Sequence, residues 1–200
     1  MENVFKNDKR SLRTRSLIKR AVIIQLKTKR PDEIGVSEVT KLATVSRNSF
    51  YTHYNTINDV LDDIFSDIIT QFDNIMSKYS YDDFVNDPYH ALKEMSYIIL
   101  NHQAFSKHVV FSKNSNLFVQ GLIDALTDKF YQIYLGTRGT SNIKVKYLIS
   151  FLVAGCLEFI YKWFKDGNSD NFDDVLTQIS LLVKDGIVMI RTIKNQLEKA

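Results

Sequence analysis

A run of polar side chains near residue 50 could form several hydrogen bonds with one partner. The run comprises Arg47, Asn48, Ser49, Tyr51, Thr52 and His53. A carboxamide can pair with adenine through two hydrogen bonds, and a guanidinium can pair in the same way with guanine or a phosphate. The chemistry of this run is therefore recognition of base edges, for which Arg47, Asn48 and Ser49 are the candidates, and of phosphates, for which Tyr51 and His53 are the candidates.

A short helix is expected just before this run. Val39, Leu42 and Ala43 recur at i, i+3 and i+4, which predicts one buried face. Glu38 and Lys41 then lie on the outer side.

A second short helix is expected to display the run itself. Ser46 is a favoured residue for capping its beginning. Phe50 and Tyr54 lie one helical turn apart and are expected to pack inward, which directs Asn48, Ser49 and Thr52 to solvent. Two short helices joined by a tight turn are typical of a helix-turn-helix that enters DNA. The alternative is that both are ordinary helices of an all-helical domain.

The charge distribution favours the first interpretation. Residues 1–60 contain twelve Lys or Arg and six Asp or Glu, whereas residues 61–200 contain fourteen and seventeen. The net charge of +3 therefore combines a basic first part with an acidic remainder. Such an asymmetry is expected when only one end of a protein neutralises phosphates.

The first sixty residues resemble the DNA-binding domain of the tetracycline-repressor (TetR) family of bacterial transcriptional regulators. The matching residues are Thr14, Arg15, Ile18, Ala21, Val36, Val39, Ala43, Val45, Ser46, Phe50, Tyr51, His53 and Tyr54. The Lys-Arg-Pro-Asp-Glu-Ile segment at residues 29–34 further resembles a DhaS-like subgroup.

Three positions depart from the family pattern. Thr44 stands where the family usually has a turn Gly, and a β-branched residue tolerates positive φ poorly. Asn48 replaces a common small residue. Ile57 occupies a position that is often a phosphate-contacting Lys. The turn is expected to differ or to be strained, and individual DNA contacts are expected to differ.

Catalytic and metal chemistry have little support in the sequence. His53, His90, His102 and His108 show no H-x-x-x-H spacing, and no nucleophile elbow, phosphate loop or dinucleotide fingerprint is present. The single cysteine, Cys156, excludes an internal disulfide and is expected to be a small buried hydrophobe rather than a redox sensor. We expect no enzyme activity, no metal and no cofactor.

The expected fold is all-α. Residues 1–56 are expected to form a three-helix helix-turn-helix domain, joined to a helical ligand-binding and dimerisation domain at residues 57–200. The N-terminus lacks an apolar secretory stretch, so a cytoplasmic protein is expected. Helices of the second part are predicted at residues 56–78, 88–103, 104–112, 115–135, 142–165 and 172–198. An apolar stretch at residues 147–157 is too short to span a bilayer and predicts a buried helix.

The last helix shows a seven-residue repeat, which indicates a seam between close-packed helices. One row contains Leu176, Val183, Ile190 and Leu197, and the other contains Phe172, Ile179, Gly186 and Ile193. In the family the last two helices form a four-helix dimer interface, which implies such a role here for Leu176, Ile179, Val183, Gly186 and Ile190. Packing inside one subunit could produce the same pattern.

The resemblance also implies an effector pocket in the helical body. Aromatic side chains that could line it are Phe118, Phe130, Tyr134, Phe151, Phe159 and Trp163. The alternative is that these rings fill the core. The resemblance as a whole implies a regulator, with repression most expected, that binds a palindromic operator in double-stranded DNA as a homodimer and is released by an unidentified small molecule. Control by a protein partner and a helical adaptor or enzyme are the alternatives.

Overall fold

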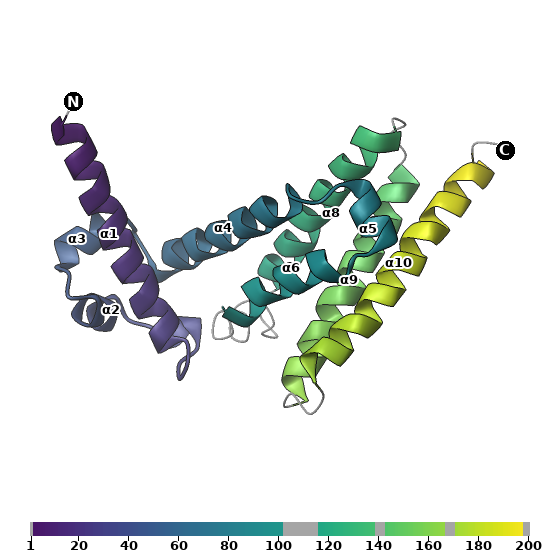
Figure 1. The fold of residues 1–200 in the computed structure, drawn as a ribbon. Helices are drawn as coiled ribbons and strands as arrows, with labels where there is room; N and C mark the ends of the chain where they lie inside the picture. The colour runs from purple at the N-terminus through teal and green to yellow at the C-terminus, as the bar shows by residue number, and fades with distance from the viewer. Residues whose placement is uncertain (1, 102–115, 139–142, 167–170, 198–200) are drawn as a thin grey trace. The chain divides into compact units, whose positions relative to one another are not determined.

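The computed structural model describes residues 2–101, 116–138, 143–166 and 171–197. Within these ranges the chain is helical and contains no β-strand, which confirms the all-α prediction (Figure 1). The chain divides into two compact units. The boundary between them falls within one helix, between Ile68 and Ile69. We call residues 2–68 the N-terminal unit, and the described residues from Ile69 onward, apart from Asn116, the C-terminal unit.

Five elements build the N-terminal unit. They are α1 (Glu2–Gln25), the 3-10 helix η1 (Pro31–Glu33), α2 (Val36–Ala43), α3 (Arg47–Tyr51) and the first part of α4 (Ile57–Met76). Their apolar faces share one core, in which Ile18, Val22, Val39, Phe50 and Val60 have no solvent exposure. The core therefore holds α3 through Phe50, and the predicted inward packing of Phe50 and Tyr54 is confirmed.

The buried face of α2 differs from the prediction at one position. Val39 and Ala43 are buried, but Leu42 is 47% exposed, and Thr40 is buried instead. Thr40 can occupy the apolar side because its hydroxyl donates a 3.1 Å hydrogen bond to the carbonyl of Ser37. Thr40 and Leu42 flank the Val39–Ala43 line at equal angles on a 3.6-residue helix, so the helical period alone does not decide which of them is buried.

Thr44 forms the turn between α2 and α3 in the left-handed helical conformation, at φ 55° and ψ 43°. The Val45 amide donates to the Thr40 carbonyl at 3.0 Å, which closes α2 as a Gly-ended helix is commonly closed. Ser46 then begins α3, and its hydroxyl accepts a 3.0 Å hydrogen bond from the Ser49 amide. The capping prediction is confirmed, and the turn is made with a residue disfavoured at this φ.

The C-terminal unit contains the rest of α4 and five further helices. These are α5 (Tyr81–Asn86), α6 (Tyr89–Asn101), α8 (Asn116–Arg138), α9 (Ile143–Lys165) and α10 (Phe172–Leu197), as Figure 1 shows. Four of them agree with the predicted ranges to within a few residues, and the helix predicted at residues 104–112 lies outside the described residues. Helix α5 was not predicted, although Ser80 and Asp83 cap it reciprocally, which is a recognisable signal.

Helices α9 and α10 pack closely within this unit. A Cβ atom added to Gly186 on α10 would lie 2.6 Å from Cδ2 of Leu152 on α9. Gly186 therefore allows Leu152 of the same chain to contact the α10 backbone. None of the helices in the described ranges combines the length and apolar character that a membrane crossing requires.

Candidate nucleic-acid interface and body cavity

The outer surface of α3 presents most of the side chains predicted to contact DNA. Arg47, Asn48 and Thr52 are exposed, and Tyr51 is 55% exposed. Ser49 is partly buried. Since Phe50 is fully buried beside them, α3 keeps these groups on its outer side.

Several of these polar groups already have partners within the chain. The Arg47 guanidinium donates to the hydroxyl of Ser37. The Ser49 hydroxyl lies 2.9 Å from the Ser46 hydroxyl, and the Thr52 hydroxyl donates to the Asn48 carbonyl at 2.8 Å. Among the described residues, the carboxamide of Asn48 has no such partner. The Asn48 carboxamide therefore keeps its donors and acceptor available to a partner outside the described chain.

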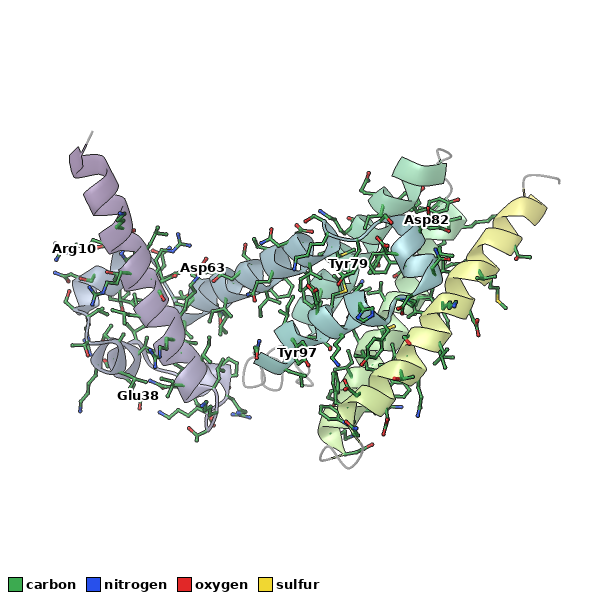
Figure 2. All side chains as sticks on the ribbon, viewed as in Figure 1. Arg10, Glu38, Asp63, Tyr79, Asp82 and Tyr97 are labelled. Carbon is green, nitrogen blue, oxygen red and sulfur yellow. The ribbon has the colours of Figure 1, made fainter. Side chains whose placement is uncertain are left out.

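A hydrogen-bond network connects Tyr54, in the turn after α3, to α1 and α4. The Tyr54 hydroxyl donates to Oδ2 of Asp63 at 2.5 Å, and Arg15 donates to Oδ1 of Asp63 at 2.7 Å. Lys19 lies 3.4 Å from the same carboxylate. Figure 2 labels Asp63 near the beginning of α4, beside α1. His53 is partly buried, with its ring packed 6.4 Å from that of Tyr54.

This network shifts the pKa values of Asp63 and Tyr54 in opposite directions. Burial raises the pKa of the Asp63 carboxyl, but the hydrogen bonds from Tyr54 and Arg15 outweigh burial and hold that pKa below its usual value. Burial and the hydrogen bond to Asp63 raise the pKa of Tyr54. The charged carboxylate and the neutral phenol therefore stabilise each other in the folded state.

The beginning of α4 is capped by Thr56 and Asp59. The Asp59 amide donates to the Thr56 hydroxyl at 3.2 Å, and Asp59 accepts in return from the amide of Thr56 at 3.2 Å. Ile57, at the position that is often a Lys in the family, is almost fully buried. It therefore contributes to the core of the N-terminal unit and offers no phosphate contact.

The N-terminal unit also carries exposed cations that lie outside the ion pairs formed among the described side chains. These residues are Lys9, Arg10, Arg13, Arg20, Lys27 and Lys41. By contrast, Lys29 pairs with Glu38 at 2.7 Å, and Arg30 pairs with Asp32 at 3.1 Å. The positive charge outside ion pairs therefore lies mainly on α1 and α2. Such charge is what binding to phosphates requires.

The C-terminal unit contains a cavity of about 120 Å³. Of the rings predicted to line a pocket, Phe130 and Tyr134 do so. Phe151 does not, because it is 74% exposed. Phe159 and Trp163 do not line it either, and Trp163 packs instead against Phe172 at 4.7 Å. The side chain of Phe118 lies outside the described residues.

Much of the lining was missed by sequence reasoning. It includes Phe72, Tyr81, Phe84, Met95, Cys156 and Leu157, which come from α4, α5, α6 and α9. Sequence patterns identify apolar faces but do not show which of them meet around an empty space. Cys156 is partly buried rather than fully buried, and burial raises the pKa of its thiol to about 11, which disfavours the reactive thiolate. The described residues contain no cluster of His, Cys, Asp or Glu able to hold a metal ion.

The predicted interface rows of α10 mostly face the interior of their own subunit. Leu176 and Ile179 are 1% and 2% exposed, and both line the cavity together with Val183. Gly186 contacts Leu152, and the side chain of Ile190 lies outside the described residues. Packing of α10 within its own unit therefore accounts for the seven-residue repeat. A repeat predicts that another helix packs against these residues, but it does not show whether that helix belongs to the same chain.

A different apolar surface lies exposed on the same two helices. It consists of Ile143, Tyr147 and Phe151 on α9 and Leu181, Leu182, Val188 and Met189 on α10, and we call it the outer face. Gly155 on α9 adds an exposed position where a new Cβ would meet nothing within 4 Å. Exposed apolar side chains that gather on one face are candidates for an interaction site. The signal in the sequence was the i, i+4 spacing of Ile143, Tyr147 and Phe151.

A small helical unit with an outward polar α3 and a basic surface, followed by a larger helical unit, defines a helix-turn-helix transcriptional regulator. A family model described as a transcriptional regulator C-terminal region matches residues 86–185, which is half of the chain. The chain belongs to the TetR family of transcriptional regulators, and is therefore a regulator rather than an enzyme. No curated protein matches by sequence.

Solved structures of this class share the fold. One is the dihydroxyacetone kinase operon activator DhaS, at 16% identity and a TM-score of 0.65, with 90% of this chain and 97% of that chain covered. A TetR regulator from Streptococcus agalactiae 2603V aligns at 20% identity and a TM-score of 0.63, covering 90% and 98%. A TetR-family protein from Syntrophomonas wolfei aligns at 14% identity and a TM-score of 0.65, covering 86% and 93%.

Proposed function

We propose that this regulator binds an inverted-repeat operator as a homodimer and represses transcription until a small molecule releases it. Residues 1–56 supply the DNA contacts, and residues 57–200 supply the effector site and the dimer interface. The observation that carries the proposal is the Asn48 carboxamide, which is exposed and has no hydrogen-bond partner among the described residues, on a helix α3 anchored in the core by Phe50. The proposed place of action is the cytoplasm, where the operator lies.

In this proposal α3 enters the major groove. Asn48 reads a base edge, with adenine as its preferred partner. Arg47 and Ser49 assist at neighbouring edges after exchanging their contacts with Ser37 and Ser46 for contacts with DNA. Tyr51, Thr52 and His53 lie toward the phosphates. Exposed cations of α1 and α2 supply affinity that does not depend on sequence.

Binding measured on operator and random duplexes tests these roles. Asn48→Ala should weaken operator binding by about 1–3 kcal/mol and leave random DNA unchanged. Tyr51→Phe, the matched change of a phosphate contact, should weaken both duplexes about equally. The logarithm of the wild-type affinity should fall with the logarithm of salt concentration, at about −0.9 per phosphate neutralised. Equal losses on both duplexes for Asn48→Ala would remove its assignment as a base contact.

We place the dimer contact on the outer face of α9 and α10. The support is that Phe151, Leu182 and Met189 are all more than 60% exposed within one subunit. Burial of such side chains favours association by about 25 cal/mol for each Å² of apolar surface removed from water. A two-fold dimer would present two α3 helices to successive turns of DNA, which accounts for an inverted repeat.

Sedimentation of surface variants tests this placement. Phe151→Ser and Leu182→Ser should each shift the wild-type dimer toward monomer. Leu12→Ser, which alters an apolar residue of α1 that is 57% exposed, is the matched control and should leave the dimer intact. If Leu12→Ser dissociated the dimer and the two outer-face variants did not, the interface would lie elsewhere.

The cavity in the C-terminal unit supports control by a small molecule over control by a protein partner. Helix α4 carries both Phe72, which lines the cavity, and Asp63, which bonds Tyr54 in the turn after α3. Activation is a second candidate, favoured by the name of DhaS as an operon activator. A reporter fused to the operator distinguishes the two, because deletion of the regulator raises expression under repression and lowers it under activation.

A further inference from the structure

The lining of the cavity is neutral throughout its described residues. It is formed by α4, α5, α6, α8, α9 and α10 of the C-terminal unit, and no described lining residue is charged. Side-chain oxygen or thiol groups come from Tyr81, Ser96, Tyr134 and Cys156. A ligand that enters would therefore exchange water for hydrocarbon and aromatic surface over nearly all of its own area.

The polar groups at the wall have little capacity to solvate a charge. The Ser96 hydroxyl already donates to the Lys93 carbonyl at 2.8 Å, and Ser96 is 2% exposed. The Cys156 thiol remains neutral at physiological pH, because burial raises its pKa to about 11. Nearby Lys93 points elsewhere, since it pairs with Asp173 at 3.0 Å. An ion placed here would lose its hydration without gaining a counter-charge, which disfavours charged ligands strongly.

The shape of the wall favours a flat ring. Phe84 and Phe130 meet edge to face at 5.0 Å, and Tyr81 meets Tyr134 edge to face at 6.2 Å. These four rings all line the cavity. Aromatic side chains accept a further ring in stacked or edge-to-face contact. The volume of about 120 Å³ is close to that of an engineered apolar cavity of about 150 Å³ that holds benzene.

We infer that the cavity binds an uncharged, predominantly apolar molecule about the size of one aromatic ring. This inference rests on the proposed effector function, whose ligand class it specifies. Polar substituents on the ligand are limited to a hydroxyl or similar neutral group that can bond to Tyr81 or Tyr134. Carboxylates, phosphates and ammonium compounds of the same size are excluded.

Four one-ring probes that differ mainly in charge test the inference on the full-length chain. Titration calorimetry should detect binding of toluene and benzyl alcohol. Benzoate and benzylammonium should bind at least about 100-fold more weakly, because each must bury a charge. Binding of benzoate or benzylammonium as tight as that of toluene would overturn the inference, and so would an absence of binding by all four probes.

Two substitutions locate the binding in this cavity. Val153→Phe fills the space and should weaken toluene binding at least tenfold, whereas Asn74→Phe adds the same ring at an exposed position of α4 and should leave it unchanged. Leu157→Ala enlarges the cavity and should improve binding of naphthalene relative to toluene. That gain of binding remains informative even if Val153→Phe folds poorly. Unchanged preferences in both Val153→Phe and Leu157→Ala would overturn the assignment.

Operator binding in the same samples separates this inference from the proposed function. If toluene binds the cavity without altering operator affinity, the ligand class stands and the effector function fails. If a charged compound alone releases the operator, the effector function stands and the ligand class fails.

Discussion

The Tyr54 hydroxyl lies 2.5 Å from Oδ2 of Asp63, and this contact joins the turn after α3 to α4. Tyr54 is 5% exposed, and its ring packs 5.9 Å from that of Phe50, so the hydroxyl has a fixed direction. Arg15 on α1 holds the other oxygen of the same carboxylate. The orientation of α3 therefore depends on a network that makes no direct contact with its exposed face.

Removal of the Tyr54 hydroxyl should loosen α3 without changing its outer surface. Tyr54→Phe leaves the ring in the core but leaves Asp63 one donor short, at a cost of about 1–2 kcal/mol. Hydrogen exchange of the amides in residues 47–54 should then be roughly 5- to 30-fold faster. Tyr51→Phe removes an exposed hydroxyl from the same helix and should leave exchange unchanged. Equal protection in wild type and Tyr54→Phe would show that the core alone positions α3.

Acid should weaken the N-terminal unit partly through Asp63. The folded-state pKa of Asp63 lies below its usual value, so the unfolded chain binds this proton more readily. The stabilisation by the carboxylate is complete above about pH 4 and is lost as the pH falls from there through the folded pKa. Asp63→Asn should reduce stability at neutral pH and flatten the loss below pH 4, as measured by hydrogen exchange of α3. Asp62→Asn, at the adjacent exposed position, should retain the wild-type profile.

Replacement of Thr44 should relieve strain in the turn. Its φ of 55° places a β-branched residue in a region that costs about 1–2 kcal/mol for residues with a Cβ. Glycine adopts this conformation freely but loses more entropy on folding, so Thr44→Gly should stabilise the N-terminal unit by about 1 kcal/mol. Thr44→Val retains the branched Cβ and should change stability little. Denaturant unfolding followed by circular dichroism measures the stability of both variants. A Thr44→Gly variant less stable than wild type would show that Thr44 is not strained.

Gly186 should matter for the stability of the subunit. Gly186→Leu would force side-chain atoms against Leu152, at a cost of about 1–3 kcal/mol to the C-terminal unit. Leu152→Ala in the same chain should recover part of that loss. Gly136→Leu on α8 is the matched control, because a Cβ there also meets nothing within 4 Å and the position lies outside the outer face, so it should not lower thermal stability. Unchanged stability in Gly186→Leu would place this glycine outside the subunit core.

Helix caps and buried positions were predictable from the sequence where they depend only on one residue and its near neighbours along the chain. Ser46 caps α3, Thr56 and Asp59 cap α4, and Phe50 is buried, because each depends on helical spacing and on short-range hydrogen bonds. The same reasoning recovered the long helices. It missed α5, whose six residues are too few to show a clear apolar period.

Partners distant in sequence were harder to predict. Phe151 and Leu176 are both apolar residues of long helices, yet one is 74% exposed and the other 1%. Their difference depends on which faces of α9 and α10 meet the rest of the C-terminal unit, and helical periodicity does not specify this. The residues of the cavity wall and the Arg15–Asp63 pair belong to the same class, because they require the packed arrangement of several helices.

Selection of bound sequences from random duplex DNA, using the full-length wild-type protein, tests most directly whether this chain is a sequence-specific dimeric regulator. The selected pool should converge on an inverted repeat with half-sites about one helical turn apart. Asn48→Ala should relax one position in each half-site, with adenine as the expected wild-type base. A pool that stays random after repeated rounds, or that converges on a single site without two-fold symmetry, would contradict the proposed function.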